Sequence, residues 1–113
     1  MVQNREHYEP LLTEIRQQIR DRLYRLTAHA EREREADRVT IREIEEALLS
    51  EQCQVVENYP EDQRGASCLV LGFTEYGLPI HAVCGISLPH ILIIITVYRP
   101  DPEQWIDWKI RRR

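Results

Sequence analysis

The feature that most constrains this chain is a change in hydrophobic period near Cys53. Before this point, apolar residues recur every three or four positions, the spacing of an amphipathic helix. After it, short apolar segments alternate with turns that contain glycine and proline, a pattern typical of strands. The strand-like segments are residues 53–59, 67–73, 80–86 and 91–98. Helices followed by a strand meander predict an α+β fold, with N-terminal helices packed on a four-stranded antiparallel sheet.

Three helices are predicted in the first half of the chain. An apolar stripe over about residues 9–24 defines the first, and it consists of Leu11, Ile15, Ile19 and Leu23. Thr27 can cap a second, charge-rich helix with the sequence "AHAEREREADR". Thr40 and Glu43 form a capping box that opens a third helix.

The last strand ends at "VYRPDPEQW" for a reason that lies in the backbone. Pro100 lacks an N–H group and disfavours helix in the residue before it, so neither a strand nor a helix continues there. Pro102 suits the first turn of a short C-terminal helix that carries Trp105. We expect Trp105 and Trp108 to cover the end of the sheet, and the basic tail, residues 109–113, to be disordered.

Size and charge limit the possible partners. The 113 residues, 42% of them hydrophobic, are enough for one domain, residues 1–113, with one core. The net charge of −4 argues against long-range attraction of nucleic acid. The charge is uneven, however, because residues 99–113 carry five basic and three acidic side chains. A polyanion would therefore meet the C-terminal end or the arginines of the first half.

We expect a cytoplasmic protein with no cofactor and no contact with membranes. "MVQNREHYEP" lacks the apolar core of a signal peptide, and "ILIII" is far shorter than the roughly 20 residues that span a bilayer. Cys53, Cys68 and Cys84 lie in strand-like segments without a C-x-x-C pair. This arrangement predicts reduced, buried thiols and no metal site.

The polar candidates each have two interpretations. His29 lies just inside the second helix, where it either bonds a neighbouring backbone group or acts as a general base or phosphate contact. His81 lies in an apolar segment, which is typical of a buried structural histidine but also allows acid–base chemistry. Arg32, Arg34 and Arg38 form either a solvated, ion-paired helix face or a row of anion contacts.

Strict alternation divides the last strand between two faces. One face would carry Tyr98 together with Leu92, Ile94 and Thr96, and the other face the residues between them. Whether His81 shares the face of Tyr98 depends on the strand register, which the sequence leaves open. Tyr98 is either an anchor at the strand end or part of a site, and Arg99 would point away from it.

Six segments carry a resemblance to a known family. In order within residues 26–105 they are "LTAHAERE", "TIREIEEALL", "VVENYPED", "SCLVLGF", "G-LPIHAV" and "IIITVYRPDPEQW". This set is similar to a small bacterial and cyanobacterial family of unknown function whose genes often lie beside MqsA/YgiT-type zinc-finger antitoxins. The additional amphipathic helix, in residues 1–25, lies outside the resemblance.

The resemblance implies the toxin half of a type II toxin–antitoxin pair with a RelE-like fold. The activity it implies is metal-independent mRNA cleavage, as in RelE/MqsR-like toxins. The implied partners are the zinc-finger antitoxin and either mRNA or the ribosome, and a homodimer is left open. Such cleavage needs a base for the ribose 2′-OH, a cation for the phosphorane and an acid for the leaving 5′-oxygen. The candidate catalytic residues are His29, His81, Tyr98, Arg34 and Arg38, with Arg32 and Arg99 as substrate-binding residues.

The chain departs from the family pattern at two positions. Related sequences carry arginines four and eight residues after the histidine, where this chain has Glu33 and Asp37. Two alternatives to an endoribonuclease therefore stay open. One is a non-catalytic module that binds a partner protein through its sheet, and the other is a diverged, inactive relative.

Overall fold

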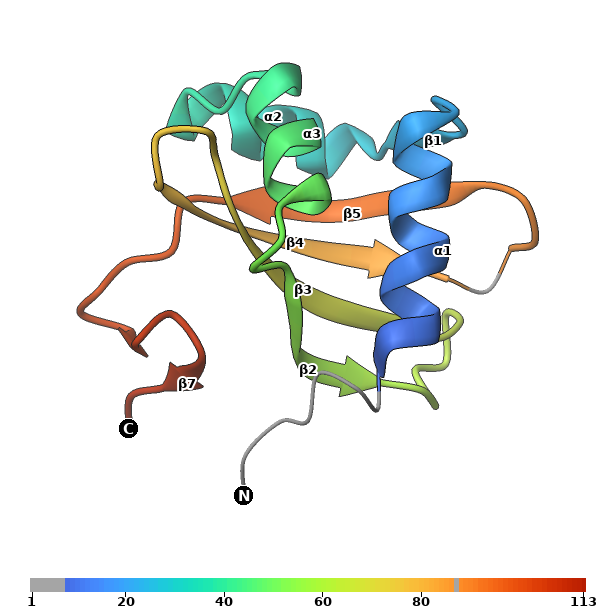
Figure 1. Cartoon of the computed structure of the whole chain (residues 1–113). Coiled ribbons are helices and arrows are strands. Elements are labelled where there is room, and N and C mark those ends of the chain that lie inside the picture. The colour runs from blue at the N-terminus through green and yellow to red at the C-terminus, as the bar shows by residue number, and fades with distance from the viewer. Residues whose placement is uncertain (1–7, 87) are drawn as a thin grey trace.

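A computed structural model describes residues 8–86 and 88–113 (Figure 1). The helices are α1 (Glu9–Arg20), α2 (Ala28–Asp37) and α3 (Ile41–Leu49). The strands are β1 (Tyr24–Leu26), β2 (Gln54–Tyr59), β3 (Ser67–Phe73), β4 (Pro79–Gly85), β5 (Leu92–Tyr98), β6 (Trp105–Ile106) and β7 (Ile110–Arg111). None of the helices in this described part is long and apolar enough to cross a bilayer.

The main sheet has five strands and is mixed, which corrects the prediction of four antiparallel strands. Its order is β1-β5-β4-β3-β2, and β1 pairs with β5 in parallel while the other pairs are antiparallel. The α+β class is confirmed. Strand β1 was missed because the predicted first helix, about residues 9–24, extended into its first residue and the predicted second helix began soon after it. The helix ends earlier, at Arg20, and Arg22 takes a positive φ of 58° that turns the chain into β1.

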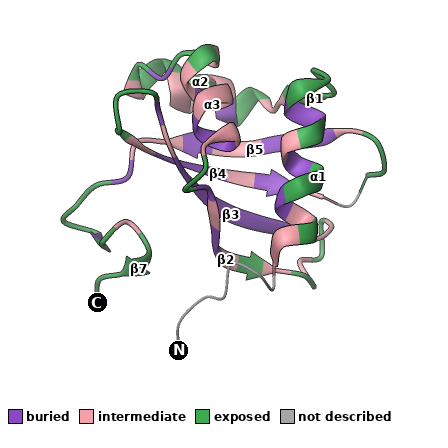
Figure 2. Ribbon diagram, in the orientation of Figure 1, coloured by how far each residue is buried: buried purple, intermediate pink, exposed green. Residues whose placement is uncertain are grey.

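Helices α1 and α3 cover one face of the sheet, and the core lies between them and the central strands (Figure 1). Strand β3 is buried along nearly its whole length, as expected for a segment covered on both sides (Figure 2). Thr27 caps α2, and Thr40 and Glu43 form the capping box of α3, as predicted. All three cysteines are free and buried.

Helix α2 lies along the edge of β5, and two acidic side chains fix it there. Glu33 accepts a hydrogen bond from the backbone N–H of Val97 at 3.1 Å, and Asp37 accepts one from the N–H of Arg99 at 2.9 Å. Four residues of helix rise about 6 Å and two residues of strand rise about 6.6 Å, so the two spacings match. Glu33 and Asp37 therefore lie where β5 offers these two backbone donors.

A bulge in β5 overturns the predicted alternation of that strand. Val83 pairs with Thr96 but Cys84 pairs with Ile94, so Ile95 is one extra residue in β5. Val97 consequently joins the core on the helix side, together with Leu92 and Ile94. Thr96 and Tyr98 lie on the opposite, helix-free face, so the grouping of Tyr98 with Leu92 and Ile94 was wrong.

The segment after β5 contains no helix, which corrects the prediction of a short C-terminal helix. Strands β6 and β7 form a small antiparallel hairpin, and Asp107 and Trp108 take positive φ values of 53° and 64° in its turn. Part of the expected disordered tail, Ile110–Arg111, is strand β7. We call residues 100–113 the C-terminal clasp, because they fold back against the main sheet.

Candidate functional site

His81 and Tyr98 meet on the helix-free face of the sheet. They are direct partners in the β4–β5 register, and His81 Nδ1 lies 3.1 Å from the Tyr98 hydroxyl oxygen. Their rings meet edge to face, with centroids 5.3 Å apart. The register that the sequence left open therefore places these two candidates together.

The clasp closes over His81. The Nε2 atom of His81 lies 2.7 Å from the backbone carbonyl of Trp108. A carbonyl can only accept a hydrogen bond, so Nε2 carries the proton and the bare Nδ1 accepts from the hydroxyl of Tyr98. The ring of Trp105 packs edge-on against the imidazole at 4.5 Å, and His81 is 0% exposed. Both nitrogens of His81 are thus used within the chain.

Burial sets the protonation of this pair. It lowers the pKa of His81 below the ordinary 6.5, although the Trp108 carbonyl and Glu57 oppose the shift, while Arg111 adds to it. Burial also raises the pKa of Tyr98 to about 12. At neutral pH the pair is therefore an uncharged imidazole and an uncharged phenol.

An ion pair anchors the clasp to β2. Arg111 donates two hydrogen bonds to Glu57, at 2.7 and 3.1 Å, and its guanidinium lies 4.7 Å from the centre of the Trp105 ring. The hydroxyl of Tyr59 also donates to Glu57. Burial opposes ionisation of Glu57, but the hydrogen bonds from Arg111 and Tyr59 outweigh it and lower the pKa.

The sequence did not single out Glu57, Tyr59 or Arg111. Alternation within residues 53–59 does place Glu57 and Tyr59 on one face. Nothing in the sequence connects that strand with Arg111, 54 residues away, because the contact depends on how the clasp folds back.

The buried imidazole predicts a pH-dependent stability. Because folding lowers the pKa of His81, the unfolded chain binds more protons between the folded pKa and 6.5. This contribution is complete above pH 6.5 and is lost as the pH falls from there toward the folded pKa. Urea unfolding between pH 7.5 and 5 should show the decline. The decline should be smaller in His81→Phe, and equal slopes of stability against pH in the two proteins would contradict the prediction. Glu57 does not interfere with this measurement, because its lowered pKa affects stability only below about its ordinary value of 4.5.

His29 lies apart from this cluster, on α2. Its side chain is 58% exposed, and Nε2 lies 3.3 Å from the carboxylate of Glu33, one helical turn later. Thr27 positions this end of the helix, because its hydroxyl donates to the carbonyl of Ile95 at 2.8 Å and its N–H bonds the carbonyl of Ile94. The structure thus joins His81 to Tyr98 but does not bring His29 to them.

The candidate arginines divide into two groups. Arg34 bonds Glu31 at 2.7 Å and the carbonyl of Val39, so it holds the end of α2 together. Arg99 bonds the carbonyls of Asp37 and Arg38 and the carboxylate of Glu43, so it links the end of β5 to the α2–α3 junction.

The other two candidate arginines stand in solvent. Arg32 is exposed, three residues after His29. Arg38 is also exposed and ends α2 with a φ of 56°. Within the described residues neither side chain has a hydrogen-bonding or ion-pair partner, so both are available to an anion. The catalytic and substrate-binding roles of all seven residues stay predictions.

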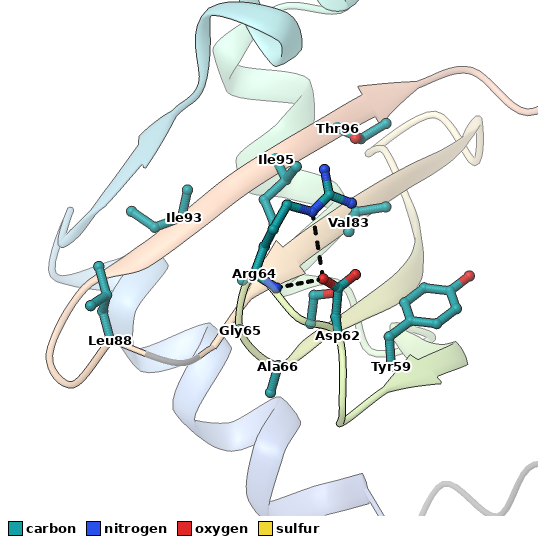
Figure 3. A pocket seen from close by; sticks show the side chains of 12 residues that line it. Tyr59, Asp62, Arg64, Gly65, Ala66, Val83, Leu88, Ile93, Ile95 and Thr96 are labelled. Carbon is teal, nitrogen blue, oxygen red and sulfur yellow. Dashed lines mark hydrogen bonds and ion pairs between the residues drawn. The ribbon is translucent and has the colours of Figure 1, made fainter.

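A pocket of about 580 Å³ lies on the same helix-free face, next to the closed cluster (Figure 3). Val83 and Thr96 line it, and each is two residues from His81 or Tyr98 along its strand. Ile93 and Ile95 of β5 form an apolar wall, and Arg64 and Asp62 lie at the loop side, 3.5 Å apart (Figure 3). This volume falls within the roughly 300–1,000 Å³ typical of small-molecule sites.

Comparison with known proteins identifies the family. The model of a family described as a domain of unknown function, DUF4258, matches residues 26–99. The chain belongs to the DUF4258 family. No curated protein and no solved structure matches the chain.

The DUF4258 match covers most of the candidate site residues but not the C-terminal clasp. It begins at Leu26, as the resemblance predicted, but ends at Arg99 instead of residue 105. It therefore includes His29, His81, Tyr98 and the pocket, whereas the C-terminal clasp lies outside it. In the described part of this chain, no group of three histidine, cysteine or acidic side chains is arranged to hold a metal ion.

Proposed function

We propose that this DUF4258 protein is an RNA-cleaving toxin of the RelE/MqsR-like type, with His29 as its general base. The observation that carries the proposal is the environment of His29. Its imidazole is 58% exposed and held by Glu33, on a helix whose first turn is tied through Thr27 to Ile95, a wall residue of the pocket. A base that is exposed and oriented by a neighbouring carboxylate can reach a ribose hydroxyl and take its proton, as proton abstraction requires.

The reaction would be an attack by a ribose 2′-oxygen on the neighbouring phosphate. His29 takes the 2′-OH proton, a P–O2′ bond forms and the P–O5′ bond breaks, which leaves a 2′,3′-cyclic phosphate. The leaving 5′-oxygen takes a proton from water, since His81 is fully buried and the Tyr98 hydroxyl is bonded to it. Arg32, exposed three residues after His29, would stabilise the negative charge of the phosphorane. Glu33 is a positioning residue, because it acts through His29.

The cellular setting is a further part of the proposal. A toxin of this type would be neutralised by a zinc-finger antitoxin, and its RNA would be free mRNA or mRNA on the ribosome. Ribosomal presentation would lessen the penalty of the −4 net charge for RNA binding. A neighbouring short reading frame with two C-x-x-C pairs would support the pairing.

His29→Ala is expected to lower the rate of RNA cleavage by about 10²-fold or more, the usual contribution of a general base. It should also relieve the growth arrest caused by expressing the chain alone in bacteria. The matched control is His90→Asn, because His90 is also exposed and asparagine tolerates its φ of 69°. Glu33→Gln, which can still accept from Val97, should lower kcat with little change in KM. Full cleavage by folded His29→Ala would contradict the proposal.

A non-catalytic, protein-binding module is the second candidate function. The observation that favours it is the closed state of His81, whose two nitrogens are bonded inside the chain. Under this alternative the helix-free face would bind a partner protein through its pocket. Harmless expression of the folded wild-type chain, with no RNA cleavage, would favour this function over the first.

A further inference from the structure

We infer that the pocket on the helix-free face binds one unstacked nucleotide of single-stranded RNA. This inference rests on the proposed function and names how its substrate is held. The base would lie against the apolar wall, and the flanking phosphates would meet arginines at two sides of the pocket.

The wall of the pocket suits the flat face of a base. Val83 of β4 and Ile93 and Ile95 of β5 supply aliphatic side chains, and Leu88, 48% exposed, also lines the pocket (Figure 3). The ring of Tyr59 closes another side and offers an aromatic surface on which a base can stack. Unstacked bases of single-stranded RNA are recognised by such aromatic and apolar surfaces.

Two arginines place positive charge beside this wall. Arg64 lines the pocket, and its side chain is 91% exposed, with Asp62 as its ion-pair partner at 3.5 Å. Arg25 of β1 pairs with Ile93 in the parallel register, and neighbours in register point to the same face of a sheet. Arg25 is exposed and, within the described residues, has no ion-pair partner. These cations give an acidic protein a local surface that suits phosphates.

The polar groups inside the pocket suit a base more than a second phosphate. Asp62 brings a carboxylate, which would repel a phosphate but can accept from the amino groups of a base. The hydroxyl of Thr96 can both donate and accept. A duplex would not fit this arrangement, because its bases are stacked and paired. The pocket therefore favours a single strand from which one base can turn out.

The test measures the affinity of a fluorescent single-stranded oligoribonucleotide by anisotropy. The full chain carries His29→Ala and the RNA carries 2′-O-methyl groups, so that the strand is not cleaved whether or not His29 is the base. Adding Arg25→Gln should weaken binding and lower the slope of log Kd against log salt by about 1. Leu88→Asp, at an exposed position of the pocket lining, should weaken binding about tenfold or more through repulsion and loss of apolar contact. Arg42→Gln is the control, since Arg42 is 80% exposed on α3 and pairs with Glu46.

The outcomes separate the nucleotide site from the proposed catalytic role of His29. Unchanged affinity in both pocket variants would overturn the nucleotide site, even if His29→Ala has abolished cleavage and so upheld the proposed function. Equal weakening by Arg42→Gln would also overturn it, because binding would then follow total charge and not the pocket. Weakening confined to Arg25→Gln and Leu88→Asp supports the site, even if cleavage persists in His29→Ala and the proposed base is wrong. Displacement of the RNA by an equal concentration of duplex would contradict the preference for single strands.

Discussion

Trp105→Ala is expected to destabilise the protein by about 3–5 kcal/mol, the usual loss for truncating a buried tryptophan. Trp105 is 3% exposed and packs with Val56, Leu69 and Leu71 while it covers the ring of His81. A small domain has only about 5–15 kcal/mol of stability in total, so the change should be large on any unfolding curve. Urea unfolding followed by circular dichroism measures it.

The matched control for this variant is Trp108→Ala. Trp108 is only half-buried, and the group that His81 binds is its backbone carbonyl, which the substitution keeps. A much smaller loss is therefore expected. Titration by NMR provides a second measurement, because an opened clasp would return the pKa of His81 toward its ordinary 6.5. If the two tryptophan variants lost equal stability and His81 stayed shielded in both, the clasp would not be held by Trp105.

Gly72→Ala is expected to prevent folding or to cost more than about 4 kcal/mol, a loss outside the usual range for one substitution. A Cβ atom on Gly72 would lie 2.0 Å from the carbonyl oxygen of Ala47 and 2.5 Å from its carbonyl carbon. Both are backbone atoms of α3, so no side-chain rotation can relieve the clash. Helix α3 would have to move off the sheet. Thermal unfolding, together with the dispersion of amide signals in an NMR spectrum, tests this expectation.

Gly77→Ala separates steric overlap from backbone strain. Gly77 has a φ of 80°, which an alanine adopts with strain, but a Cβ there would meet nothing within 4 Å. We expect a loss of about 1–2 kcal/mol from strain alone. A Gly72→Ala protein as stable as Gly77→Ala would show that α3 does not approach β3 as closely as described.

Local signals in the sequence predicted much of the fold. Thr27 and Thr40 marked helix starts because a cap is decided by residues three positions apart. The four longer strands followed from short apolar segments and their turns. Strand β1, with three residues, carries too little pattern to stand out against the helix before it. A short helix around Trp105 was predicted because Pro102 favours a helical first turn, whereas the packing of Trp105 selects a hairpin.

The candidate site was less predictable, because it depends on contacts between distant segments. His81 and Tyr98 meet only through the β4–β5 register, and the extra residue Ile95 decides which side chains share their face. A single bulge moves the side chains of all later residues in the strand to the opposite face of the sheet, and no individual residue type predicts where a bulge occurs. The exposure of His29 and the closure of His81 likewise follow from what α2 and the clasp pack against.

The two carboxylates of α2 that bond β5, Glu33 and Asp37, also protect the protein against aggregation. A strand at the border of a sheet offers unused amide groups to any extended peptide, and such borders seed aggregation. Glu33 and Asp37 accept hydrogen bonds from the N–H groups of Val97 and Arg99, so these two donors are not available to pair with an added strand. Strand β1 pairs only with residues 92–94 of β5, and the two carboxylates of α2 protect the chain beyond them from pairing with another protein.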